Sequence, residues 1–360
     1  MTTTLSVASI IVLAVTLLPL WRHQHWLIRG LDFPRLQFAT LAAIIIVLQC
    51  VFVDLSRPSL ALLLLCNVLC LVWQLWWIVP YTPLWPKEVL SCTSDSKAPR
   101  VSIMTANVLT PNRNAQALLE HVAHYQPDLL VTLESDQWWE TQLDSLSKQM
   151  PFSVKCPLDN LYGMHLYSRF PLLETDIAFL VEKGVPSIHG LVALPDGNKI
   201  RLHCLHPAPP SPTENPESGE RDAELMLIAR SVAESEYPVI VTGDLNDVAW
   251  SSTTRLFRKI SKLLDPRVGR GLFNTFHADF PFLRWPLDHV FHSRHFCLSS
   301  IKRLPPIGSD HFALFAVLSF SETPLQSQSG LTPQAQDKNR ARAITEQQDV
   351  RKSDVPQPGS

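Results

Sequence analysis

The chain has 360 residues, enough for one large domain with additional segments, and 46% of them are hydrophobic. Its formal net charge of −2 excludes the strongly basic character that is typical of dedicated DNA-binding proteins. The seven cysteines form no C-x-x-C pair, which argues against a zinc site, and their spacing requires no oxidising compartment. Four of them are isolated and are interpreted as small buried residues: Cys92, Cys156, Cys204 and Cys297.

Residues 1–98 contain three apolar stretches without charged side chains, at 4–21, 36–53 and 59–80. A helix needs about 20 apolar residues, and at least about 17, to cross the hydrocarbon core of a bilayer. The third stretch ends in a cluster of aromatic residues, which is typical of a membrane interface. The first lacks the basic start and the cleavage site of a signal peptide. We therefore predict three transmembrane helices with the lipid bilayer as their partner; the sequence indicates no protein partner.

The charges between these helices predict an orientation. The first loop has three arginines against one aspartate and the second has one of each: Arg22, Arg29, Arg35 and Asp32, then Arg57 and Asp54. The positive-inside rule places the arginine-rich loop in the cytoplasm, which puts the N-terminus outside and the domain after the third helix inside. Extracytoplasmic placement stays open, because the bias amounts to a few charges.

In residues 99–320, short runs rich in β-forming residues alternate with helical patterns. Apolar residues recur at helical spacing in 114–125 and 218–236, and the prolines between Pro207 and Pro216 predict a surface loop. These patterns alone indicate an α/β or α+β fold. Residues 321–360 are dominated by Gln, Ser, Pro and charges. Because such a segment buries too little apolar surface to offset its ordering entropy, we expect a disordered tail.

The run from Val239 to Asp247, Val-Ile-Val-Thr-Gly-Asp-Leu-Asn-Asp, is the most informative motif. A buried strand is predicted to end there, just past a glycine, with Asp244 and Asn246. Residues two apart on an extended backbone face the same side. A carboxylate beside a carboxamide is suited to binding and deprotonating a water molecule. The alternative is an ordinary polar turn at the end of a strand.

Other polar residues lie where apolar stretches end or begin. The runs 101–107 and 128–134 are predicted strands that end in such residues, and 200–207 and 287–291 follow the same pattern. In chain order, the polar residues at these positions are Asn107, Glu134, His206, Asp288, Asp310 and His311. A site assembled from them would combine carboxylate, amide and imidazole groups.

In their order and local sequence, these motifs resemble the endonuclease/exonuclease/phosphatase superfamily of DNase I-like nucleases, abasic-site endonucleases, inositol polyphosphate phosphatases and neutral sphingomyelinases. The resemblance covers about residues 99–320 and rests on Gly-Asp-Leu-Asn at 243–246, Leu-Asp-His-Val-Phe at 287–291 and Ser-Asp-His at 309–311. The branch with an N-terminal membrane region, the bacterial YafD-like proteins, is most similar. The resemblance implies a four-layer α/β/β/α sandwich and a multi-pass protein of the bacterial inner membrane.

The resemblance also implies a bound divalent ion, Mg²⁺ or Mn²⁺ in its place. Glu134 is the best hard-oxygen ligand for Mg²⁺, and Asp310 resembles a further carboxylate near the metal. By the same resemblance, Asp244 orients and deprotonates the attacking water, and Asn246 steadies that water or a phosphate oxygen. Asn107 resembles the asparagine that supports the metal ligand and the base.

Asp288 and His311 are expected to pair, because a carboxylate that accepts from one imidazole nitrogen raises the basicity of the other. A protonated His311 could then bind a phosphoryl oxygen. His206 resembles the histidine that protonates or stabilises the leaving oxygen in DNase I-like enzymes. His203 and His289 are left out of the site, because their spacing from His206 and Asp288 places them on the opposite strand faces.

One position departs from the pattern of the superfamily. Many of its nucleases have an acidic or amide residue two positions after the first-strand asparagine, where this chain has Leu109. Because leucine cannot bind a cation or a water molecule, we expect a single Mg²⁺ held chiefly by Glu134.

Together these features predict a membrane-anchored, Mg²⁺-dependent hydrolase of phosphodiester bonds. A nuclease is favoured; the alternative is a hydrolase of phospholipid, sphingolipid or inositol phosphate, and the second alternative is a non-catalytic membrane interaction protein. Basic residues between 255 and 270 suit a polyanionic substrate, or form a solvated helix face. Placement beside a bilayer would favour lipid head groups.

Overall fold

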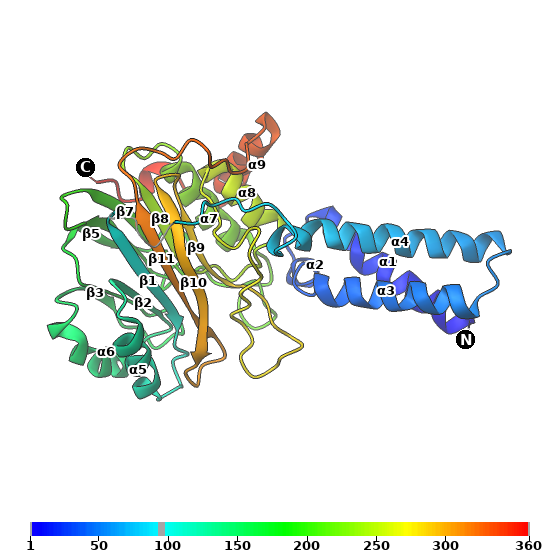
Figure 1. The fold of residues 1–360 in the computed structure, drawn as a ribbon, viewed down its shortest axis with the longest axis horizontal. Coiled ribbons are helices and arrows are strands. Elements are labelled where there is room, and N and C mark those ends of the chain that lie inside the picture. Colours follow the sequence, from blue (N-terminus) through cyan, green and yellow to red (C-terminus); the bar gives the residue numbers. More distant parts are fainter. Residues whose placement is uncertain (1, 93–97, 359–360) are drawn as a thin grey trace.

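Three long apolar helices form an elongated bundle beside a sandwich of two β-sheets (Figure 1). The computed structural model describes residues 2–92 and 98–358. The bundle consists of α1 (Thr2–Leu17), α3 (Arg35–Phe52) and α4 (Pro58–Ile78), and the 3₁₀ helices η1 (Leu18–Trp21) and η2 (Val79–Tyr81) extend α1 and α4. All three are long and apolar enough to cross a membrane, and their limits lie within two residues of the predicted ones.

Polar side chains inside the bundle hold its helices together. Asn67 Nδ2 of α4 donates to Ser9 Oγ of α1 at 2.8 Å and to Gln49 Oε1 of α3 at 3.0 Å. Nearer the sandwich, Gln74 Nε2 donates to Thr16 Oγ1 at 3.0 Å. These groups are buried inside a bundle whose outer surface is apolar, so their hydrogen bonds fix how the helices pack.

The segment between α1 and α3 attaches the bundle to the sandwich. It contains the short helix α2 (Trp26–Gly30), whose Arg29 forms a buried ion pair with Asp222 of the sandwich. Trp250 Nε1 donates to the carbonyl of Asp32 at 2.8 Å. Further hydrogen bonds at this junction join Trp26 N to Pro216 O, Tyr81 OH to Ala249 O, and Gly269 N to Pro80 O.

The sandwich contains a six-stranded and a five-stranded sheet. The first has the order β10-β11-β1-β2-β4-β3 and the second the order β5-β6-β7-β8-β9. The strands of the first sheet are β1 (Arg100–Asn107), β2 (Leu129–Leu133), β3 (Phe152–Cys156), β4 (Met164–Ser168), β10 (Phe296–Pro306) and β11 (Phe312–Phe320). Those of the second are β5 (Leu172–Ala178), β6 (Ser187–Ala193), β7 (Lys199–Leu205), β8 (Val239–Asp244) and β9 (Asp288–His292).

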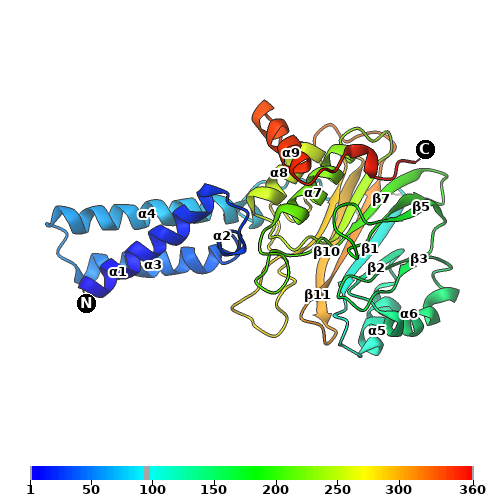
Figure 2. The same ribbon diagram turned by 180° about the vertical axis from the view of Figure 1, so that it is seen from behind.

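Side chains that alternate along the strands build three apolar layers between four layers of structure. On β1, Val101 and Ile103 face the core between the sheets, whereas Met104 and Ala106 face the outer helices. The outer elements of the first sheet are α5 (Ala115–Tyr125), α6 (Gln137–Leu143) and η3 (Asp144–Lys148), and α7 (Gly219–Val232) and α8 (Ser252–Ser261) cover the second (Figure 2). The predicted four-layer α/β/β/α sandwich is confirmed.

The C-terminal segment is ordered where disorder is expected from its composition. Helix α9 (Ala335–Gln347) buries Ala341 and Ile344 in the cluster that also holds apolar residues of α7 and α8, and η4 (Lys352–Asp354) follows. Asp337 of α9 forms an ion pair with Lys259 of α8 at 2.9 Å. The few apolar residues of this segment suffice, because the helices beneath it supply most of the apolar surface.

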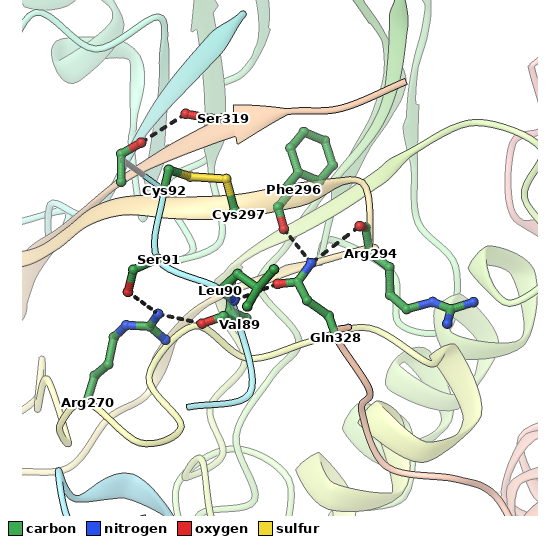
Figure 3. Close-up of a disulfide and its surroundings, with 11 residues drawn as sticks. Val89, Leu90, Ser91, Cys92, Arg270, Arg294, Phe296, Cys297, Ser319 and Gln328 are labelled. Carbon is green, nitrogen blue, oxygen red and sulfur yellow. Dashed lines mark hydrogen bonds between the residues drawn. A yellow bond between two sulfur atoms is a disulfide. The ribbon is translucent and has the colours of Figure 1, made fainter. Parts of the chain in front are cut away.

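A disulfide joins Cys92 to Cys297, whose Cα atoms are 5.5 Å apart (Figure 3). The interpretation of these two residues as isolated thiols is therefore wrong. They are 205 residues apart in sequence, so their spacing gives no sign of the pairing. Cys92 N donates to Leu298 O at 2.9 Å, which brings the chain leaving α4 alongside β10. Cys156 and Cys204 are free, and Cys204 is buried as expected.

Candidate active site

The sheet topology brings the strand-end residues to one edge of the sandwich. In the first sheet, β1 and β2 are parallel neighbours, so Asn107 at the end of β1 and Glu134 just after β2 lie side by side. In the second sheet, β7 and β8 are also parallel neighbours, so His206 just after β7 lies beside Asp244 at the end of β8. The carboxyl ends of parallel strands meet at one edge, and here the two sheets present these edges to each other.

Two strands that run antiparallel to these neighbours, β9 and β11, contribute residues from their N-terminal ends to the same edge. β9 begins with Asp288, which is paired in register with Asp244 at the end of β8. His311 immediately precedes β11, which runs antiparallel to β1. At this edge some strands end and others begin. Site residues from about two hundred positions of sequence are therefore brought together there.

Asn107 connects the two sheets within the site. Its Nδ2 donates to Glu134 Oε1 at 2.7 Å and to Asp244 Oδ2 at 3.3 Å. Its Oδ1 accepts from the backbone N–H of Leu109 at 3.1 Å, which fixes the orientation of the amide. Leu109, where the chain departs from the pattern of the superfamily, therefore supports the site through its backbone N–H.

His311 lies between two carboxylates. Its Nδ1 is 2.9 Å from Asp288 Oδ2 and its Nε2 is 3.4 Å from Asp244 Oδ2, and all three side chains are buried. Burial by itself lowers the pKa of an imidazole, but the two carboxylates outweigh it and raise the pKa of His311 to about 10. Burial raises the pKa of Asp244 against the opposing charge of His311. The two carboxylates therefore favour the protonated form of the His311 imidazole.

Gly243 allows the two strand ends to approach each other. Its φ is +144°, and a Cβ at this position would lie 1.8 Å from the carbonyl oxygen of Leu205 on β7. Any larger residue would therefore separate β7 from β8. Glycine is therefore required at position 243 for His206 to lie beside Asp244.

Asn246 does not extend the strand as predicted. Its φ is +49°, so the chain turns and the alternation of an extended backbone ends at Asp244. Its backbone N–H donates to Asp244 Oδ1 at 2.9 Å, and its Nδ2 donates to the carbonyl of Pro207 at 3.0 Å. Asn246 thus orients Asp244 and holds the loop that follows His206.

His206 is a buried, neutral imidazole. Burial lowers its pKa to about 4, although the nearby charge of Asp244 acts in the opposite direction. Its Nδ1 has no hydrogen-bond partner among the described residues. The ring of Tyr162 lies 5.3 Å from it, centroid to centroid. Tyr162 was not predicted, because it lies in a loop without any periodic pattern.

Glu134 fits the requirements of a cation ligand. Its Oε2 is buried and has no hydrogen-bond partner within the described part of the chain. Burial raises its pKa to about 7, and the charges of Asp310 and Asp244 act in the same direction while the hydrogen bond from Asn107 opposes them. Asp310 is half-buried, and its Oδ1 accepts from Ser309 Oγ at 3.3 Å. A carboxylate oxygen without a partner beside other carboxylates is a suitable donor set for Mg²⁺.

A second group of ligand atoms lies close together but suits a metal ion less well. One atom each of Asp244, Asp288 and His311 lies within 4.8 Å of the others. Both nitrogens of His311 already face carboxylates, and a protonated imidazole cannot bind a metal ion. Among these three residues, the contacts of His311 with both carboxylates already occupy the two ring nitrogens.

Residues from other loops support the site without having been predicted. Thr275 Oγ1 accepts from the backbone N–H of Asp288 at 3.2 Å, and the ring of Phe276 lies 4.9 Å from that of His311. Ser309 Oγ accepts from the backbone N–H of His311 at 3.0 Å, so the first residue of Ser-Asp-His orients the last.

The two excluded histidines lie in structural contacts. His203 Nδ1 is 2.7 Å from His189 Nδ1, and His289 Nδ1 is 2.6 Å from an Nη2 atom of Arg267. His289 Nε2 is also 2.9 Å from the carbonyl of Asp247. Neither ring contacts the groups described above.

The basic residues between 255 and 270 are largely committed to structural contacts. Arg258 pairs with Glu88, Arg267 with Asp265 and Lys259 with Asp337. Arg270 donates to the carbonyl of Val89 at 2.5 Å. These contacts stabilise the packing of α8 and the loop after it, whereas Arg255 and Lys262 form no ion pair with the described residues.

A two-sheet sandwich that gathers carboxylate, amide and imidazole groups at one edge defines a class of enzymes that cleave phosphoester bonds. Residues 104–311, more than half of the chain, match the model of the Endonuclease/Exonuclease/phosphatase family. The chain belongs to this family, which depends on a divalent metal ion. The resemblance in the sequence motifs is thereby confirmed at the level of the family.

Solved structures share the fold at low sequence identity. The human Nocturnin catalytic domain with bound sulfate anion is 20% identical with a TM-score of 0.52, over 62% of this chain and 96% of that one. An endonuclease/exonuclease/phosphatase from Beutenbergia cavernae DSM 12333 is 15% identical with a TM-score of 0.50, over 62% of this chain and 72% of that one. These similarities show the fold alone. No curated protein gives a significant match to the chain.

Proposed function

We propose that the protein is a membrane-anchored, Mg²⁺-dependent hydrolase of phosphodiester bonds. In this proposal residues 1–98 anchor the protein in a bacterial inner membrane as a YafD-like protein, and residues 99–320 carry the reaction. The observation that carries the proposal is the chain of contacts from Glu134 through Asn107 to Asp244 and on to His311 and Asp288. It joins a cation ligand, a base and a cationic hydrogen-bond donor in one buried cluster.

Glu134 and Asp310 would hold the ion, and Mn²⁺ could replace Mg²⁺. When bound, such an ion supplies positive charge to the phosphate oxygens. The remaining chemistry is assigned to the side chains of this protein. No further metal ligand is needed from the Leu109 position.

Asp244 accepts a proton from the attacking water as the oxygen of that water forms a bond to phosphorus. Burial favours this step, because a carboxylate with a raised pKa is a stronger base. His311, held as an imidazolium by Asp288, donates a hydrogen bond to the negative phosphoryl oxygen. The bond from phosphorus to the leaving oxygen breaks while neutral His206 donates a hydrogen bond to that oxygen. A proton from solvent water converts the leaving alkoxide to an alcohol, and Asp244 releases the proton that it accepted to the resulting hydroxide.

The proposal is tested with the full chain in detergent micelles and bis-p-nitrophenyl phosphate as substrate. Asp244→Asn and His311→Ala should each lower the Mg²⁺-dependent rate by about 100-fold or more, because a general base and a hydrogen-bond donor to the developing negative charge each contribute at least this much. Chelation of the metal should abolish activity, and added Mg²⁺ or Mn²⁺ should restore it.

Matched controls remove the same chemical groups from exposed positions. Asp196 and His124 are exposed and precede β7 and β2, at the ends of these strands opposite to His206 and Glu134, so Asp196→Asn and His124→Ala should retain the wild-type rate. Wild-type activity in Asp244→Asn or in His311→Ala would refute the mechanism.

A further inference from the structure

A cavity of about 490 Å³ lies against the catalytic groups, where the bundle meets the sandwich. His311 and Asn246 form part of its wall. The rest of the lining is mainly apolar and comes from both parts of the molecule; it includes Trp26, Phe33, Pro210, Phe276, Leu283 and Trp285. Its size is within the range of ligand sites, about 300–1,000 Å³. An apolar chamber thus opens directly onto polar catalytic groups.

The chamber lies at the level where the apolar helices begin. Trp26 and Phe33 belong to the segment between α1 and α3. Gln37, in the first turn of α3, donates from Nε2 to the carbonyl of Phe282 at 2.7 Å, which fixes the neighbouring loop of the sandwich at the same level. The side chain of Phe282 is 87% exposed and that of Phe280 is 55% exposed. Large apolar side chains exposed at the end of a membrane bundle suit contact with a bilayer.

The lining is unsuited to a nucleic acid. Recognition of a nucleic-acid backbone requires lysine or arginine side chains against its phosphates. Among the described residues that line the chamber there is no lysine or arginine, and Arg284 beside it donates to the carbonyls of His277 and Ala278.

We propose that the substrate is a membrane phospholipid whose phosphodiester lies at Asp244 and His311 and whose acyl chain occupies this chamber. The inference rests on the proposed function and narrows its substrate class. The polar wall matches the phosphate, the apolar wall matches the chain, and the opening at the bundle lets a lipid enter from the bilayer. The sequence motifs alone favour a nuclease, whereas the apolar lining of the chamber favours a lipid substrate.

The first test uses the full-length wild-type protein in nanodiscs. Phosphatidylglycerol and phosphatidylethanolamine are compared with glycerophosphoglycerol and glycerophosphoethanolamine, which carry the same phosphodiester without acyl chains. Product release is followed by mass spectrometry. We expect kcat/KM for the lipids to be at least about 100-fold higher, on the scale of specificity gained by burying many methylenes. Equal values, or cleavage of plasmid DNA with none of either lipid, would overturn the proposal.

The second test alters the wall of the chamber. Leu283 is 48% exposed, so Leu283→Lys adds a charge to the wall without burying it completely. The ratio of lipid hydrolysis to bis-p-nitrophenyl phosphate hydrolysis should fall at least tenfold. Phe152→Lys is the matched control, because Phe152 is 36% exposed on β3 at the end of the sandwich away from the bundle (Figure 1).

The outcomes separate the two levels of the proposal. An unchanged ratio in Leu283→Lys, or an equal fall in Phe152→Lys, would overturn the lipid chamber and leave the proposed hydrolase intact. Absence of hydrolysis of bis-p-nitrophenyl phosphate by the wild type would instead refute the proposed function itself.

The disulfide supports a second, independent inference about the side of the membrane. Hydrogen bonds hold the backbone beside the disulfide. Leu298 N donates to Leu90 O at 2.8 Å. Leu90 N donates to Gln328 Oε1 at 2.8 Å (Figure 3). Forming the bond removes two protons and two electrons from the thiols, which a protein disulfide oxidant accepts by thiol–disulfide exchange. Disulfides persist in the periplasm and in other oxidising compartments and are rare in the cytosol.

The arginines that indicated the opposite orientation have structural roles. Arg29 pairs with Asp222 of the sandwich, and Arg35 pairs with Asp32 and donates to Gln74 Oε1 at 3.0 Å. Arg57 of the second loop pairs with Asp54 in the same way, so Arg22 remains and the bias between the two loops is a single charge.

We infer that the sandwich lies on the extracytoplasmic side of the membrane. The loop between α1 and α3 lies on the same side, because it packs on the sandwich. The N-terminus lies at the far end of the bundle and would face the cytoplasm (Figure 1).

This placement is tested in bacterial cells that produce the full chain. A C-terminal alkaline phosphatase fusion should be active and a C-terminal green fluorescent protein fusion should be dark. Labelling of denatured whole-cell protein with a maleimide polymer should modify two more thiols after reduction, and this gain should be absent in Cys92→Ser and in Cys297→Ser. A fluorescent fusion, or no gain on reduction, would overturn the inference.

Discussion

Glu224 lies on α7 with 2% of its surface exposed, and its Oε1 has no hydrogen-bond partner among the described residues. Burial, assisted by the charge of Glu182, raises the pKa of Glu224 from 4.5 to about 8. Between these two values the folded protein retains a proton that the unfolded chain has lost. Raising the pH through this window therefore lowers the free energy of unfolding, by about 1.4 kcal/mol for each pH unit between the two pKa values.

The variant Glu224→Gln should remove this dependence, because the amide does not titrate. Its melting temperature in detergent should fall less than that of the wild type from pH 5 to pH 8 and should be the higher of the two at pH 8. Glu236→Gln, at an exposed position four residues beyond the end of α7, is the control. Parallel melting curves for wild type and Glu224→Gln would contradict the assignment.

The sequence predicts which residues meet at the site better than it predicts how they are oriented. Asn107, Glu134 and Asp244 were found because polar residues at the ends of apolar strands are recognisable. The side-chain direction of Asn246 could not be predicted, since it depends on a left-handed turn. Tyr162 was missed because its position depends on a loop, and loops have no periodicity to read.

At the scale of elements, α9 is the feature that the sequence least suggests. It covers apolar residues of α7 and α8 with Ile344, which is 8% exposed. Ile344→Ala should lower the free energy of unfolding by about 2–4 kcal/mol, the usual cost of truncating a buried isoleucine. Thermal or denaturant unfolding of the full chain measures the effect, and Glu346→Ala on the exposed face of α9 is the control. A loss no larger than that of the control would mean that α9 does not stabilise the sandwich.

The elements that were predicted correctly are those with a strong local signal. The bundle helices follow from their length and lack of charge, and α5 and α7 follow from apolar spacing. The order of α9 depends instead on the surface that it covers, and the disulfide depends on a pairing across 205 residues. Composition and spacing describe a segment by itself. They cannot predict properties that depend on a partner far away in the sequence.

At the scale of the whole molecule, Arg29 is the main electrostatic connection between bundle and sandwich. It pairs with Asp222 and donates to Ser218 Oγ at 3.1 Å and to Thr253 Oγ1 at 2.9 Å. Arg29→Met should lower the free energy of unfolding by about 1–3 kcal/mol, because the buried carboxylate of Asp222 loses one of its two arginine partners and keeps Arg221. The same change at Arg22, an exposed residue of the same loop, should have little effect. Unfolding and limited proteolysis of both variants in detergent measure the difference.

The rigid junction between bundle and sandwich determines how the reactive edge can encounter a substrate. In the proposed membrane-anchored protein, hydrogen bonds and an ion pair fasten the sandwich to the bundle, so the reactive edge would stay at one height and tilt above the bilayer. Encounters are then confined to a plane, and turnover should scale with the number of target molecules per unit area of membrane. Doubling the water around the vesicles would leave the rate unchanged, whereas diluting the target with inert lipid would slow it.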